Sequence, residues 1–134
     1  FEVDHRPVIP SYGYRLDYEG KSVVISGDTR FSENLINFSK NVDVLIHNVA
    51  AAPREQIEQS ERLRSILDLH LTPEEAGEVF TRANPKLAVY THMVLYTSVD
   101  EVIERTRKTY HGPLEIGDDL MMFDIKNTIE IHRP

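Results

Sequence analysis

The sequence predicts an α/β fold in which a mixed sheet is flanked by helices. In the middle of the chain, short apolar runs of strand length alternate with segments of helical periodicity, which indicates at least partly parallel strand pairing. Two N-terminal capping patterns, Thr72-Pro-Glu-Glu75 and Ser98 with Glu101, mark helix starts. The 134 residues, of which 40% are hydrophobic, are sufficient for one domain with a real core.

The first elements are predicted to form strands. Residues 1–5 have the pattern of a short strand, and the prolines between residues 6 and 10 indicate an extended loop. Residues 12–18 alternate between apolar and polar, as expected of a half-buried strand. Glu19-Gly20 is predicted to be a tight turn that leads into a return strand over residues 21–26. This part of the chain therefore predicts a hairpin.

Helices and strands then alternate. Apolar residues between 31 and 38 recur at helical spacing, and Ser32 is the expected N-cap of this short helix. Residues 42–46 are predicted to form a buried strand that ends at His47, and residues 53–67 a polar helix. The remaining predicted elements are a helix from Thr72 to Asn84-Pro85, a strand over 87–90 that ends at Thr91-His92, a helix from Ser98 to about Lys108, and strands over 120–125 and 128–131.

Composition restricts the classes of function. The net charge of −7 argues against loose, charge-driven binding to nucleic acid. Because there is no cysteine, a metal site would need histidine, aspartate or glutamate ligands. No apolar run approaches the length of a membrane span, no signal peptide is visible, and a cytoplasmic location is favoured.

Polar side chains at the ends of predicted strands form the candidate site. Asp28, His47 and His92 each follow a predicted buried strand, so parallel pairing would bring them to one edge of the sheet. His5 ends the first strand-like run, and His70 precedes a helix N-terminus, where an anion is favoured. Imidazole and carboxylate groups suit zinc, and a carboxylate can bridge two metal ions. The pattern predicts a metal site.

Simpler interpretations remain open at this point. A Gly-Asp turn after a strand is often only a turn, and a lone histidine is usually a surface residue or a satisfied core residue. We interpret His111 and His132 as surface residues, and the phenylalanines at 31, 38 and 80 as core. A generic α/β binder of small molecules, without a metal, would leave His5, Asp28 and His92 scattered.

Five motifs occur in an order that resembles a known family. They are His5 followed by Pro10-Ser-Tyr-Gly-Tyr-Arg, Ser26-Gly-Asp28-Thr, Leu45-Ile-His47, His70-Leu-Thr-Pro-Glu-Glu-Ala-Gly, and Tyr90-Thr-His92. This series resembles the metallo-β-lactamase-fold hydrolases, and within them the ribonuclease Z and arylsulfatase-like branch. The resemblance implies an αββα sandwich with a two-zinc site. The family's His-x-His-x-Asp-His motif is absent, so residues 1–134 are expected to be a single partial domain, the C-terminal half of that sandwich.

The resemblance also implies a role for each site residue. His5 would bind one zinc, Asp28 would bridge both, and His92 would bind the other. His70 would contact the scissile phosphate or the leaving group and assist proton transfer, and the nucleophile would be a metal-bound hydroxide. Asn48 stands where ribonuclease Z relatives usually carry glutamate, and an amide cannot carry that charge.

The expected function is zinc-dependent hydrolysis of a phosphodiester, sulfate or other ester, with the isolated chain inactive because its ligand set is incomplete. His5 and Asp28 are only 23 positions apart, which leaves no room for a tRNA-gripping arm. This spacing and the acidic charge disfavour tRNA and favour a small substrate. The alternative is a catalytically incomplete half-fold that binds a partner or itself. Because a half-sandwich exposes one sheet face, we expect it to dimerise or to pair with the missing N-terminal half.

Overall fold

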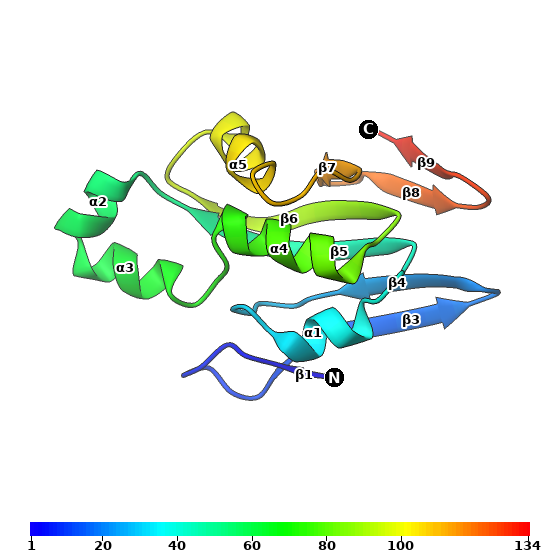
Figure 1. Ribbon diagram of the computed structural model, residues 1–134, viewed down its shortest axis with the longest axis horizontal. Coiled ribbons are helices and arrows are strands. Elements are labelled where there is room, and N and C mark those ends of the chain that lie inside the picture. Colours follow the sequence, from blue (N-terminus) through cyan, green and yellow to red (C-terminus); the bar gives the residue numbers. More distant parts are fainter.

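The computed structural model describes all residues from 1 to 134 and contains one central sheet (Figure 1). Its elements are β1 (Glu2–Val3), β2 (Ser11–Tyr12), β3 (Tyr14–Tyr18), β4 (Lys21–Ile25), α1 (Glu33–Phe38), β5 (Val44–Ala51), α2 (Arg54–Gln59), α3 (Glu61–Leu67), α4 (Pro73–Ala83), β6 (Leu87–Leu95), α5 (Val99–Thr106), β7 (Leu114–Ile116), β8 (Met122–Ile125) and β9 (Ile129–His132). The sheet has the order β3-β4-β5-β6-β7. Its β3–β4 pair is antiparallel and the other pairs are parallel, which confirms the predicted α/β class and mixed sheet.

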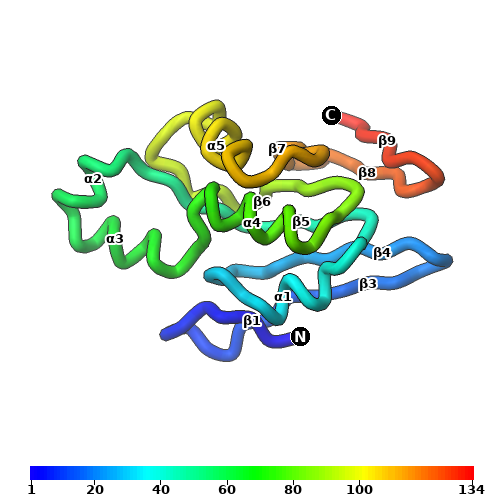
Figure 2. The backbone as a smooth tube through the Cα atoms, viewed as in Figure 1, coloured from blue at the N-terminus to red at the C-terminus, as the bar shows by residue number.

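Helices α1, α4 and α5 cover one face of the sheet, and the main core lies between them and the strands (Figure 1). Phe80 of α4 is at the centre of this core, because its ring centroid lies 5.4 Å from those of Tyr90 and Tyr110. Figure 2 traces the chain from the N-terminal segment beside α1 to the β8–β9 hairpin at the other end of the molecule. No helix of the structure combines the length and the apolar character that crossing a membrane requires.

The opposite face of the sheet is covered only in part. Phe123, Ile125 and Ile129 of the β8–β9 hairpin pack over this face, where Val44, Leu87 and Val89 form a small second core. Strand β3 lies at the sheet edge and all five of its residues are exposed, including Tyr14, Leu16 and Tyr18. The prediction of a half-buried strand there is wrong, because every residue of this edge strand is exposed. The dimer that we expect from the open face stays a prediction.

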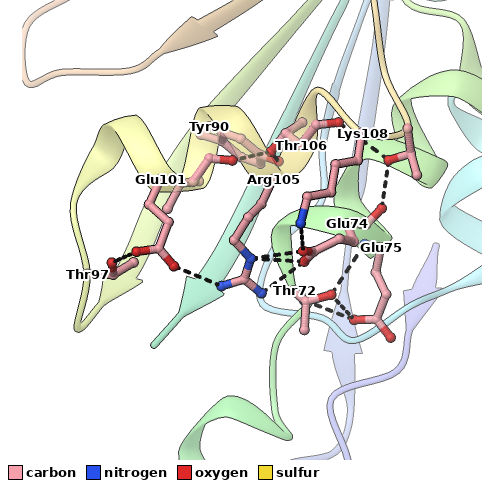
Figure 3. Close-up of polar contacts among 11 residues, drawn as sticks. Thr72, Glu74, Glu75, Tyr90, Thr97, Glu101, Arg105, Thr106 and Lys108 are labelled. Atoms are coloured by element: carbon pink, nitrogen blue, oxygen red, sulfur yellow. Dashed lines mark hydrogen bonds and ion pairs between the residues drawn. The ribbon is translucent and has the colours of Figure 1, made fainter. Parts of the chain in front are cut away.

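Helices α4 and α5 begin at the N-cap residues that the sequence predicts. Thr72 and Glu75 form the complete capping box of α4, with Pro73 in the first turn, and Asn84 ends the helix in the left-handed conformation. Ser98 caps α5 as predicted, but the Glu101 carboxylate accepts from the Thr97 hydroxyl and so completes no box there (Figure 3).

Ion pairs hold α4 against α5. The Glu74 carboxylate accepts hydrogen bonds from Arg105 at 2.9–3.2 Å and lies 3.4 Å from the Lys108 amine (Figure 3). Both partners lower the pKa of Glu74, although its partial burial opposes them.

Three predicted boundaries are wrong. The polar helix over 53–67 is divided into α2 and α3, because Ser60 is extended and its side chain caps the second helix at Leu63. Strands β5 and β6 both continue, to Ala51 and Leu95, past the histidines at which we predicted them to end. The pairing of β5 with β6 shifts register just after His47, and this irregularity accommodates polar residues inside the strands.

Candidate functional site

Four of the predicted site residues lie together at one end of the sheet. The ring centroid of His70 lies 5.5 Å from that of His5 and 5.4 Å from that of His92. The His92 Nδ1 atom is 3.1 Å from a carboxylate oxygen of Asp28. These residues come from four separate segments of the chain, so the alternative in which they are scattered is wrong.

The turn after β4 positions Asp28. Gly27 has a φ of +62°, and a Cβ atom at this position would lie 2.4 Å from the Tyr12 carbonyl oxygen, so only glycine fits. The Ser11 hydroxyl donates to the Asp28 carbonyl oxygen at 2.8 Å. The buried Thr29 hydroxyl lies 3.1 Å from the Asp4 carbonyl oxygen. The turn is therefore anchored on both sides of the carboxylate.

A bulge in β6 positions His92. His47 pairs with Tyr90, and Val49 pairs with Met93, so two residues of β6 oppose one residue of β5. His92 is one of these two β6 residues. Its φ of +43° is a strained conformation for a residue with a side chain. Bulges of this kind often redirect a side chain beside a functional site.

His5 has the hydrogen-bonding pattern of a metal-ligating histidine. Its Nδ1 atom lies 2.9 Å from the Leu69 carbonyl oxygen, and the residue is only 8% exposed. Because a carbonyl oxygen only accepts hydrogen bonds, Nδ1 carries the proton. The neutral ring therefore has its lone pair on Nε2, as in histidine ligands that are oriented by a backbone carbonyl.

The donor set fits part of a metal site. Imidazole and carboxylate groups converge, but the only three such ligand atoms within 4.8 Å of one another are elsewhere, in Asp124, Glu130 and His132 of the β8–β9 hairpin. There, the Asp124 carboxylate is 2.6 Å from the Lys126 amine. This hairpin group is not evident from the sequence, because strand pairing brings its members together. No three ligand atoms of His5, Asp28, His70 and His92 lie within 4.8 Å of one another.

Asn48 of β5 contacts the ring of His70. The Nδ1 atom of His70 lies 3.0 Å from the Asn48 side-chain nitrogen. Partial burial lowers the pKa of His70; the charge of Asp28 opposes this shift, and His92 and His5 reinforce it. His70 is therefore predominantly neutral at neutral pH.

His47 does not join the cluster, which corrects the expectation that it lies at the sheet edge. It lies within β5, is fully buried, and its ring meets Phe80 edge-on at a centroid distance of 6.0 Å. Its Nδ1 atom donates to the Asn48 carbonyl oxygen at 2.8 Å, whereas Nε2 has no partner. Burial lowers the pKa of His47 to about 4.

This buried histidine predicts a loss of stability in acid. Between pH 6.5 and 4 the unfolded chain binds a proton at position 47 that the folded chain excludes. The free energy of unfolding should therefore fall as the pH falls through this window, by about 3 kcal/mol in total. Urea unfolding at a series of pH values measures this change in the free energy of unfolding. His47→Leu should lose this component, whereas the control His111→Gln, at an exposed residue, should keep it. Identical pH dependence in His47→Leu and wild type would contradict the assignment.

Comparison with known proteins defines the class. Residues 2–93 match the β-lactamase superfamily domain, so the chain belongs to this superfamily. Among its curated relatives, ribonuclease Z of Mycolicibacterium gilvum is 34% identical over 122 residues, which are 87% of this chain and 42% of the relative. Ribonuclease Z of Mycobacterium tuberculosis H37Rv is 31% identical over 132 residues, 96% of this chain and 46% of the relative. The chain thus spans less than half the length of either relative.

Solved structures show the same fold. The metallo-β-lactamase fold protein YhfI from Bacillus subtilis has a TM-score of 0.69 and 22% identity, with 87% of this chain and 44% of that chain covered. Human tRNase Z, short form, has a TM-score of 0.59 and 22% identity, with 90% and 40% covered. The predicted resemblance to a part of a metallo-β-lactamase-fold, ribonuclease Z-like protein is therefore confirmed.

The same relatives correct the expectation about partners. We expected small esters, sulfates or phosphodiesters and disfavoured tRNA. The curated relatives are ribonucleases by name, and one of the structural neighbours is a tRNase, so this expectation is wrong. The expectation rested on the net charge and on the short spacing between His5 and Asp28. Both describe this chain alone, whereas a substrate can also be bound by the parts of the relatives that this chain does not cover.

Proposed function

We propose that this chain is part of a zinc-dependent phosphodiester hydrolase that acts on tRNA. The observation that carries the proposal is the convergence of His5, Asp28, His70 and His92 from four segments of the chain. The relatives' names support RNA as the substrate, and tRNA in particular. The chemistry of the donors supports zinc.

Each residue has a proposed role. His5 and His92 would each hold one zinc ion, and Asp28 would contribute its carboxylate to both. When bound, zinc would supply a hydroxide near neutral pH and polarise a phosphoryl oxygen. His70 contacts the scissile phosphate or the leaving oxygen. Its neutral ring is suited to hydrogen bonding with either oxygen, because it adds no positive charge beside the metal ligands.

We propose further that residues 1–134 are the C-terminal half of a domain whose remaining ligands lie outside this chain. Two imidazoles and one shared carboxylate are too few for a tight two-zinc site, which normally gives each ion three or four protein ligands. The isolated chain is then inactive, and activity belongs to the longer protein that contains it.

A second candidate is a non-catalytic module that binds a partner or itself. It is favoured by the exposed apolar side chains of β3, of which Tyr14 is 61%, Leu16 56% and Tyr18 76% exposed. The two candidates differ in what they predict for the longer protein, because only the first predicts metal-dependent cleavage of RNA.

The test compares the isolated chain with the longer protein. We expect the isolated chain to bind zinc weakly in a calorimetric titration and to leave a tRNA transcript intact. The longer protein should cleave the transcript, lose this activity to a chelator, and regain it when zinc is added. Cleavage that is insensitive to the chelator would contradict the zinc role. A zinc-loaded longer protein that leaves the transcript intact would contradict the proposed function and favour the second candidate.

A further inference from the structure

Asn48 lies in the wall of the site, between β4 and the loop that carries His70. It is 1% exposed. Its backbone N–H donates to the Ser26 hydroxyl at 3.3 Å, and its carbonyl oxygen accepts from the ring of His47. Its side-chain Nδ2 atom lies 3.2 Å from the Thr29 carbonyl oxygen and 3.0 Å from Nδ1 of His70. The amide is thus held within a packed, polar environment.

The Thr29 carbonyl decides which way the amide faces. This oxygen can only accept, so the Asn48 atom beside it must be the nitrogen. In this orientation the only unsatisfied atom of the side chain is Oδ1, which is buried without a partner. The reverse orientation would place two oxygens against each other and leave both amide hydrogens buried without acceptors. Since unpaired buried donors are costly, the observed orientation is the stable one.

The orientation of the amide fixes the proton on His70. The two hydrogens of Nδ2 are directed to the Thr29 carbonyl oxygen and to Nδ1 of His70, so Nδ1 must present its lone pair. A neutral imidazole carries only one ring proton, which is then on Nε2. We propose that Asn48 is a positioning residue that holds His70 in the Nε2–H tautomer.

This tautomer makes His70 a hydrogen-bond donor at its free nitrogen. A carboxylate at position 48 would instead accept from Nδ1–H and leave a lone pair on Nε2. With Asn48, the ring donates to an oxygen bound beside it and cannot accept a proton there while Nδ1 stays paired. For RNA, this oxygen belongs to the scissile phosphate or the leaving group. That assignment rests on the proposed function, whereas the tautomer itself does not.

Nuclear magnetic resonance tests the tautomer directly. Long-range proton–nitrogen correlation spectra of the ¹⁵N-histidine-labelled chain, recorded at about pH 8, distinguish the protonated from the unprotonated ring nitrogen of a neutral imidazole. The chain has six histidines, and His70→Gln identifies the signals of residue 70. We expect wild-type His70 to be protonated on Nε2. Protonation on Nδ1, or an equal mixture of tautomers, would overturn the proposal.

Substitution at position 48 tests the cause. In Asn48→Asp the proton should move to Nδ1, and in Asn48→Ala both tautomers should be populated. The control Asn84→Asp, at a helix end remote from the site, should leave His70 unchanged. If the buried carboxylate of Asn48→Asp prevents folding, Asn48→Ala tests the proposal alone. A His70 ring that is still protonated only on Nε2 in the alanine variant would refute the role of Asn48. These spectra are independent of RNA cleavage, so the tautomer and the proposed function can fail separately.

Discussion

Asp28→Ala is expected to abolish hydrolysis in the longer protein and to release bound zinc, whereas His70→Ala should keep the zinc and slow turnover by about 10²–10⁴-fold. The two side chains lie in one cluster, but their proposed roles differ. The Asp28 carboxylate lies 3.1 Å from Nδ1 of His92, and in its proposed role its removal would take a ligand from both metal ions. His70 is held by Asn48 and has no assigned bond to the metal.

Zinc content and turnover must be measured on the same preparations. Asp17→Ala is the matched control, because this carboxylate is exposed and pairs with Arg15 on the sheet edge. It should change neither quantity. Equal loss of zinc in the Asp28 and His70 variants would refute the division of roles, since His70 would then act as a ligand.

Phe80→Ala is expected to lower the free energy of unfolding by about 4 kcal/mol. Phe80 is completely buried, and its ring meets those of Tyr90, Tyr110 and His47 at centroid distances of 5.4, 5.4 and 6.0 Å. Truncation removes the burial of the ring and leaves a cavity where α4 meets the strands. In a chain of this size the change corresponds to a decrease in Tm of about 10–15 °C.

Phe38→Ala provides the comparison. Its ring stacks on Phe1 at 4.4 Å but is 42% exposed, so its loss should cost about 1 kcal/mol or less. Urea unfolding of both variants and the wild type measures the difference. A cost at Phe38 equal to that at Phe80 would show that the centre of the core lies elsewhere. We predicted from the sequence that both phenylalanines belong to the core, and only their packing distinguishes them.

Local sequence was sufficient for much of the fold. The hairpin at Glu19-Gly20, the caps at Ser32 and Ser98, and the capping box at Thr72 depend on residues within a few positions of one another, so they are readable without tertiary structure. The motif around Asp28 was equally informative, because the positive φ of Gly27 belongs to a short turn, although the close approach of the Tyr12 carbonyl oxygen to this residue is a tertiary contact. The break at Ser60 is also local, but we missed it because apolar spacing continues across it.

Long-range pairing decided what local sequence could not. Whether a strand ends at a histidine or continues past it depends on its neighbour in the sheet, and the bulge between β5 and β6 sends His92 into the site while His47 stays in the core. The contact between Asn48 and His70 joins residues 22 positions apart, and its direction depends on the Thr29 carbonyl. The sequence by itself therefore determined the family, the helix caps and the identity of the four converging side chains. Only the tertiary structure decided which histidines meet and which ring nitrogen faces Asn48, because both depend on contacts between distant segments.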